Sequence, residues 1–280
     1  MIISRPVPFA EAVRALAAKE LLPTTAGSAQ LERLSAEITR RGMFSAKVPH
    51  TGTLQRALDL IARIVDPVQE PGAYMDVPTF RLEMKDYLAS IGYAPEPGKQ
   101  GSIQDLMSDG RLNLIADTNE KMLHGLGQHM QAQDAEVLDA FPAQELYRAG
   151  NFFSKNQRPW VAKWQAAGGR LYGGGRMIAL KDDPIWTLRI EEGGFNRFGN
   201  PYPPFDYNSG MWVKPVSRQE AVEFGLIAQA AQVKPSGIRL DPDGLQAQLG
   251  AISGTLRDIL LQSMPPGARV DDAGVLHMES

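Results

Sequence analysis

The chain has 280 residues, with 29 lysines and arginines, 32 aspartates and glutamates, and no cysteine. This length and a hydrophobic content of 43% allow one large domain or two smaller ones with a buried core, and exclude wholesale disorder. The lack of cysteine excludes disulfides, thiolate metal sites and a cysteine nucleophile. The formal charge of −3 argues against a dedicated nucleic-acid-binding domain, which is usually basic. No apolar stretch reaches the roughly 18 to 20 residues of a membrane span, so we expect no membrane partner.

Helical periodicity dominates the first half of the chain. Apolar residues recur at intervals of three and four, which predicts helices over residues 8–19, 31–41, 53–65, 79–91 and 112–130, and a short one within 134–147. We expect Thr51 or Thr53 to cap the third helix. Gly125 and Gly127 weaken the long helix by about 1 kcal/mol each relative to alanine.

Turn residues and aromatic residues dominate the next part of the chain. Short apolar runs predict strands over residues 177–180 and 185–190. Ser217 and Glu220 match a capping box that starts a short helix, and a last helix is predicted over residues 244–261.

These elements predict an α+β fold, in which a mainly helical N-terminal region precedes a compact region of short strands, ordered loops and helices. The predicted organisation is a helical region (1–150), a loop-rich α+β region (151–227), a C-terminal helix (228–264) and a mobile tail (265–280).

No motif in the sequence points to catalysis, a metal or a cofactor. His124 and His129 are five residues apart and diverge on a helix, whereas helical metal-binding pairs use a spacing of four. An enzyme alternative, a hydrolase or transferase-type activity in the α+β region, requires Asp182, Glu191, Asp206 or a histidine to converge on one cavity. We therefore predict no catalytic residue, no metal ligand and no cofactor.

Residues 151–176, the basic aromatic segment, contain five basic residues and no acidic one. We take as a candidate interface Lys155, Arg158, Trp160, Lys163, Trp164, Arg170 and Arg176. Such a segment can contact phosphates or a protein partner. In the alternative interpretation, the aromatic side chains form core and the cations pair with the acidic segment just upstream (134–149).

Four segments, in chain order, resemble the Mu F-like minor head proteins of tailed phages. They are residues 7–23, the run RGMFSAKV at 41–48, LIADTN at 114–119 and YPPFDYNSG at 202–210. The motif residues of the last two segments are Asp117, Thr118, Asn119, Tyr202, Pro203, Pro204 and Phe205. The Cys/His-rich closing segment of many members is absent, so no metal site carries over from them.

The resemblance implies a non-catalytic virion component that acts in head morphogenesis near the portal and is linked to DNA packaging or ejection. Its partners would be the portal, other head proteins and packaged double-stranded DNA. Its location would be the capsid, and the host cytoplasm during assembly. A nucleic-acid-binding module is a further alternative, and its binding would weaken steeply with salt.

Three expectations about particular residues follow. Thr118 and Asn119 should cap or anchor the helix after them. Residues 202–210 should form an ordered loop, because prolines restrict its backbone. Reversing the charges of Lys155, Arg158 and Lys163 together should impair head assembly or DNA retention without unfolding the chain.

Overall fold

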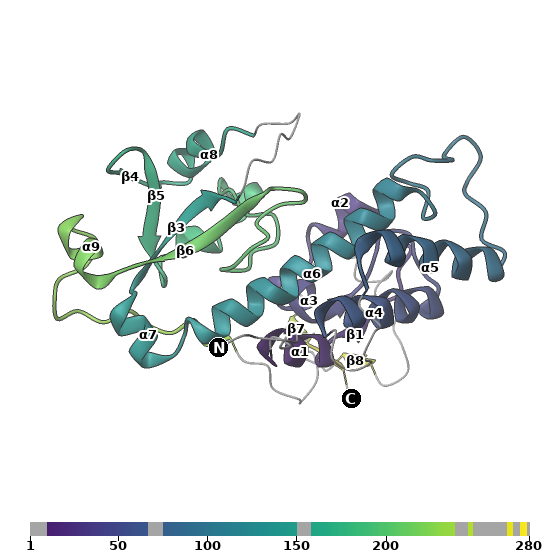
Figure 1. The fold of residues 1–280 in the computed structure, drawn as a ribbon, viewed down its shortest axis with the longest axis horizontal. Helices are drawn as coiled ribbons and strands as arrows, with labels where there is room; N and C mark the ends of the chain where they lie inside the picture. Colours follow the sequence, from purple (N-terminus) through teal and green to yellow (C-terminus); the bar gives the residue numbers. More distant parts are fainter. Residues whose placement is uncertain are drawn as a thin grey trace, which may run out of the picture. The chain divides into compact units, whose positions relative to one another are not determined.

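The structure is a computed structural model that describes residues 10–66, 75–149 and 158–238, and three short strands nearer the C-terminus. It confirms the α+β class, with a helical N-terminal half followed by an antiparallel four-stranded sheet and short helices (Figure 1). The chain divides into two compact units: residues 1–124 with 240–280, and residues 125–239. None of the described helices is long and apolar enough to cross a membrane.

The first unit is built from helices. These are α1 (Ala10–Ala17), α2 (Ser28–Leu31), α3 (Ala36–Arg41), α4 (Thr51–Val65), α5 (Val77–Ser90) and α6 (Asp109–Gln131), whose residues 125–131 belong to the second unit. Two short strands, β1 (Glu20–Leu21) and β2 (Gly42–Met43), pair in parallel. The buried faces of α4 and α5 carry predicted periodic apolar residues, such as Ile61 and Phe80, which are both fully buried.

Two details of this unit correct the sequence prediction. The helix expected over residues 31–41 is divided into α2 and α3, because the Ser35 hydroxyl accepts a hydrogen bond from the Ile38 N–H and starts a new helix. The N-cap of α4 is His50 rather than Thr51 or Thr53. Its Nδ1 accepts a hydrogen bond from the Thr53 N–H at 3.2 Å.

The second unit centres on an antiparallel sheet with the strand order β4-β5-β3-β6. Its elements are α7 (Ala135–Ala140), β3 (Ala143–Arg148), α8 (Trp160–Ala166), β4 (Leu171–Tyr172), β5 (Arg176–Leu180), the 3-10 turns η1 (Pro184–Trp186) and η2 (Ile190–Glu192), β6 (Met211–Val216) and α9 (Arg218–Glu223).

Alternate side chains of the strands point to opposite faces of the sheet. We call one of these faces the aromatic face. Its strand residues pack with buried aromatic rings in one core, which is formed by Leu146, Trp160, Trp164, Met177, Ala179, Ile185, Trp186, Phe195, Phe205 and Met211. On the other face, Ile178 and Val216 pack against Ala221 of α9. The ion pairs of Glu145 with Arg176 and Lys214 lie on this second face.

The sheet corrects several strand predictions. The strand expected over residues 177–180 is present as β5, but residues 185–190 do not form a strand. The Asp183 carboxylate accepts a hydrogen bond from the Ile185 N–H and Pro184 follows it, so the backbone turns into η1. Strands β3 and β6 were not expected, and β6 carries Pro215, which an edge strand tolerates.

The C-terminal prediction is wrong where it can be compared. Residues Gln246–Gln248 form strand β7, which with β8 (Ala268–Val270) and β9 (Val275–Met278) makes an antiparallel sheet of order β7-β9-β8. The rest of the helix predicted over 244–261 lies outside the described residues. Strands β8 and β9 fall within the predicted tail. The domain boundary predicted near residue 150 also lies outside the described residues, and strand β3 ends just before it.

Candidate functional site

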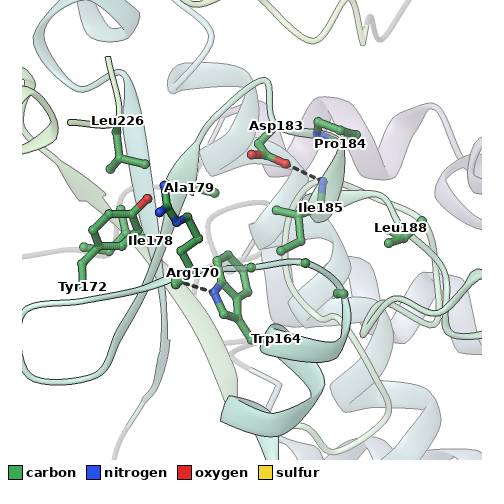
Figure 2. A pocket seen from close by; sticks show the side chains of 13 residues that line it. Trp164, Arg170, Tyr172, Ile178, Ala179, Asp183, Pro184, Ile185, Leu188 and Leu226 are labelled. Carbon is green, nitrogen blue, oxygen red and sulfur yellow. Dashed lines mark hydrogen bonds between the residues drawn. The ribbon is translucent and has the colours of Figure 1, made fainter. Parts of the chain in front are cut away.

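The basic aromatic segment places its tryptophans in the core. Trp160 and Trp164 of α8 are 4% and 0% exposed. The Trp164 ring lies 5.3 Å from the ring of Trp186 and 5.6 Å from that of Phe195, between centroids. Its indole Nε1 donates a hydrogen bond to the Arg170 carbonyl at 2.8 Å (Figure 2). The expectation that these two rings form an interface is therefore wrong, and the alternative that they form core is confirmed.

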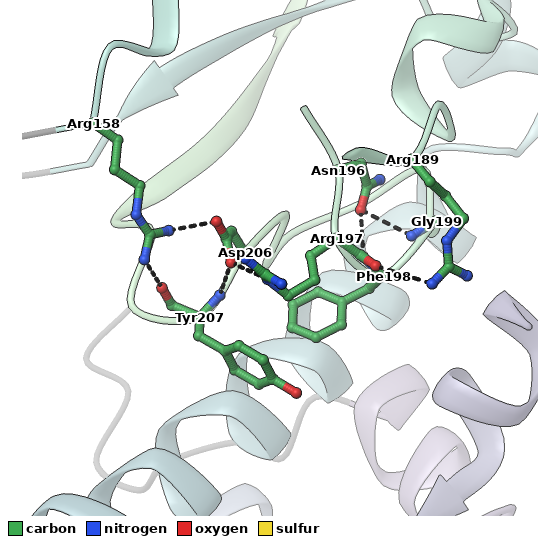
Figure 3. Close-up of polar contacts among 8 residues, drawn as sticks. All are labelled: Arg158, Arg189, Asn196, Arg197, Phe198, Gly199, Asp206 and Tyr207. Carbon is green, nitrogen blue, oxygen red and sulfur yellow. Dashed lines mark hydrogen bonds and ion pairs between the residues drawn. The ribbon is translucent and has the colours of Figure 1, made fainter. Parts of the chain in front are cut away.

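Arg158 neutralises a buried carboxylate. Its guanidinium lies 2.8 Å from Asp206 Oδ2 and donates a hydrogen bond to the Tyr207 carbonyl at 2.8 Å (Figure 3). Arg197 donates to the other Asp206 oxygen at 2.6 Å. Because Asp206 is only 2% exposed, it needs these cations to offset the cost of its burial. This corrects the expectation that the charge of Arg158 can be reversed without harm to the fold.

Arg176 is held between two carboxylates. It forms hydrogen-bonded ion pairs with Glu220, at the start of α9, and with Glu145 of β3, whose Oε2 lies 2.6 Å away. These hydrogen bonds, with that to Glu220 the larger effect, raise the pKa of the Arg176 guanidinium. Since Glu145 belongs to the acidic segment, Arg176 pairs as the alternative interpretation expects, whereas Arg158 pairs with Asp206, which lies outside the segment.

Two of the candidate cations make no ion pair within the part of the chain that the structure describes. The Lys163 ammonium lies 5.4 Å from the centre of the Trp160 ring. Arg170 is exposed and borders a pocket of about 270 Å³, together with Tyr172 and Trp164 (Figure 2). Lys155 lies outside the described residues. Among the described residues, Lys163 and Arg170 are thus the candidate interface cations that pair with no carboxylate.

The motif residues around position 118 are in the middle of a helix rather than at its start. Helix α6 begins at Asp109, so Thr118 and Asn119 do not cap it, and that expectation is wrong. The Asn119 amide instead donates to the Ile115 carbonyl one turn earlier, and Asp117 pairs with Lys121 at 2.6 Å. Both contacts are local to the helix surface.

The second motif forms a buried loop. Residues 202–210 contain neither helix nor strand, which confirms the loop prediction, and Tyr202 and Phe205 are 1% and 0% exposed. Pro203 and Pro204 are buried beside them. A Cβ atom on Gly125 of α6 would lie 2.0 Å from the Pro203 carbonyl oxygen. The glycine that weakens α6 is therefore what lets this loop approach the helix.

Asn196 was not singled out from the sequence, although it organises the turn before this loop. Its amide donates at 2.6 Å to the carbonyls of Trp186 and Asn200. Its Oδ1 accepts from the N–H groups of Phe198 and Gly199 at 2.9 Å (Figure 3). The available signal was its position in a stretch rich in glycine, asparagine and proline, where an asparagine side chain commonly replaces backbone partners.

The three carboxylates of the enzyme alternative do not share a cavity. Asp182 accepts a hydrogen bond from the Lys234 N–H, Glu191 pairs with Arg189, and Asp206 is held by its two arginines. In residues 10–66, 75–149 and 158–238, no group of three histidine or carboxylate side chains could hold a metal ion. The enzyme alternative gains no support from these positions.

Comparisons of the chain with protein families, with curated sequences and with solved structures found no match. The family resemblance therefore stays a prediction that depends on the four segments and their order.

Proposed function

We propose that this protein is a minor head protein of a tailed phage, which acts in head morphogenesis near the portal without catalysing a reaction. The observation that carries the proposal is the order of the four segments that resemble Mu F-like proteins, over residues 7–210. A component of this kind works through its surfaces, so it needs no convergent catalytic residues.

The last of the four segments packs within the second unit. Residues 114–119 lie in α6, and the Tyr202–Pro203 backbone reaches the same helix where Gly125 leaves room for it. The last segment therefore contributes to packing around the end of α6. Residues that a family retains for its fold are expected at such positions.

Two cations, the half-buried Lys163 on α8 and the exposed Arg170 after it, form the surface that we assign to partner contact. Lys163 and Arg170 make no ion pair among the described residues, whereas Arg158 and Arg176 are held by buried or partly buried carboxylates. Cations that pair with no carboxylate of the described residues can bind an acidic patch of the portal or another head protein, or the phosphates of packaged DNA.

Charge reversal tests this assignment. The double variant Lys163→Glu, Arg170→Glu is expected to reduce the yield of DNA-filled particles when it replaces the wild-type protein, because both charges would then repel an acidic partner. Particle yield and DNA content per particle are the measurements, with thermal unfolding of the purified variant to confirm that it folds.

The matched control reverses Lys99 and Lys234, which make no ion pair among the described residues. Wild-type particle yield is expected from this control. Normal yield and DNA content from the Lys163/Arg170 variant would remove these residues from the proposed contact surface.

A further inference from the structure

A second cavity, of about 390 Å³, lies within residues 125–239, next to the end of α6. It is lined by Gly125, Gln128, His129, Gln131, Ala132, Val137, Phe141, Gln144, Lys181, Tyr202, Val213, Lys214 and Pro215. Its strand residues Gln144, Val213 and Pro215 alternate with those of the second face, so they belong to the aromatic face of the sheet. Its volume is within the range of pockets that hold small ligands.

The cavity contains a buried cation that pairs with no carboxylate of the described residues. Lys181, directly after β5, is 6% exposed, and its ammonium donates only to the Ala132 carbonyl, at 3.3 Å. No carboxylate of the described residues pairs with it, in contrast to Arg158 and Arg176. Burial lowers the pKa of Lys181 to about 8, so most of the population is still protonated at neutral pH. A buried ammonium of this kind is costly unless a ligand compensates it.

The rest of the lining is mixed: apolar residues lie beside the amide side chains of Gln128 and Gln144 and the cation Lys214. Phe141 and Val137 are 39% and 36% exposed, so part of their apolar surface is in contact with water. Val213 and Tyr202 line the cavity with them. An apolar group placed here would remove these surfaces from water.

We infer that this cavity binds a carboxylate carried on an apolar group, with the carboxylate paired to Lys181 and the apolar group against Phe141 and Val213. The carboxylate would supply the counter-ion that Lys181 lacks among the described residues, and burial of the lysine side chain would strengthen the pair. Two sources share this chemistry: a free carboxylic acid with an apolar chain, and the C-terminus of a polypeptide that ends in an apolar residue. The site is separate from the cations assigned to the head protein's partner contact.

Calorimetric titration of the full chain with octanoate tests the inference. Octanoate is expected to bind at least tenfold more tightly than 1-octanol, which has the same apolar chain without the charge, because a hydrogen-bonded ion pair contributes about one order of magnitude or more. The variant Lys181→Met, of similar length and no charge, should lose this preference. The matched control Lys234→Met, an exposed lysine outside the cavity, should bind octanoate as the wild type does.

A second arm distinguishes the two sources. A short peptide that ends in leucine is titrated with a free and with an amidated C-terminus. Tighter binding of the free form than of octanoate points to a partner polypeptide, and binding of octanoate alone points to a free acid. Both results support the carboxylate site.

Three results would overturn the inference. The first is that the wild-type chain binds neither octanoate nor the free peptide. The second is that octanoate and 1-octanol bind equally, a comparison that needs no variant and so does not depend on how Lys181→Met folds. The third is that a folded Lys181→Met variant binds octanoate like the wild type, which would leave Lys181 only the role of a hydrogen-bond donor at the end of α6.

Discussion

Two buried charged side chains in the second unit, Asp206 and Lys181, differ in the partners that the fold gives them. Asp206 is 2% exposed and meets two arginines, whereas Lys181 is 6% exposed and meets one backbone carbonyl. Asp206 is thus compensated within the fold, and its contacts are structural. The charge of Lys181 is not compensated among the described residues, so we expect it to lower the stability of the free protein.

Replacement of Asp206 by asparagine tests whether the ion pairs of Asp206 stabilise the fold. Asp206→Asn is expected to lower the free energy of unfolding by about 2 to 4 kcal/mol, because Arg158 and Arg197 then face a neutral amide. Chemical denaturation measures the loss. The control is Glu191→Gln, whose carboxylate pairs with Arg189 but is 55% exposed, so that a change below about 1 kcal/mol is expected. Equal effects of the two variants would contradict this account of Asp206.

The pH dependence of stability tests whether the buried charge of Lys181 destabilises the free protein. The pKa of Lys181 falls from 10.5 in the unfolded chain to about 8 in the fold because the side chain is buried. As the pH falls through this interval, the unfolded chain binds a proton that the folded chain does not yet bind, so the free energy of unfolding decreases. Below about pH 8 the difference is constant.

Lys181→Met should therefore be more stable than the wild type at pH 7, by about 1 to 3 kcal/mol. The advantage should shrink when the same denaturation is measured at pH 9.5. A variant that is less stable than the wild type at both pH values would show that the hydrogen bond to Ala132 outweighs the cost of burial.

At the scale of elements, α6 shows how a rule of local propensity can mislead. Gly125 lowers the intrinsic stability of the helix, yet it is buried, and no other residue would leave space for the Pro203 carbonyl. The helix was predictable from its periodicity, but the reason for its glycine was not, since the contact joins residues far apart in the sequence.

Gly125→Ala is accordingly expected to destabilise the protein by about 1 to 3 kcal/mol through overpacking, despite the better helix propensity of alanine. Gly110→Ala in the first turn of α6 is the matched control, because a Cβ atom there comes no nearer than 4.0 Å to a neighbour. It should be neutral or stabilising by up to about 1 kcal/mol. The denaturant midpoints of the two variants test this expectation. Stabilisation by Gly125→Ala would contradict a tight contact between residue 125 and the Pro203 carbonyl.

For the whole molecule, the sequence predicted the α+β class and the long helices, because helix periodicity is a local property. The sequence also indicated the interpretation in which the tryptophans form core, and the position of Trp164 beside Trp186 confirms it. Strands β3 and β6 were missed because their pairing depends on distant partners. The sequence did not indicate Lys181 as a candidate binding residue, because only the fold shows that its charge is buried with no acidic partner among the described residues.

The central claim is that the protein is part of a phage particle. Quantitative mass spectrometry of gradient-purified particles from a strain that produces this protein tests it most directly. The proposal predicts a few to some tens of copies in each particle, as in a minor head component. Absence of the protein from particles, together with abundant free protein in the lysate, would contradict it.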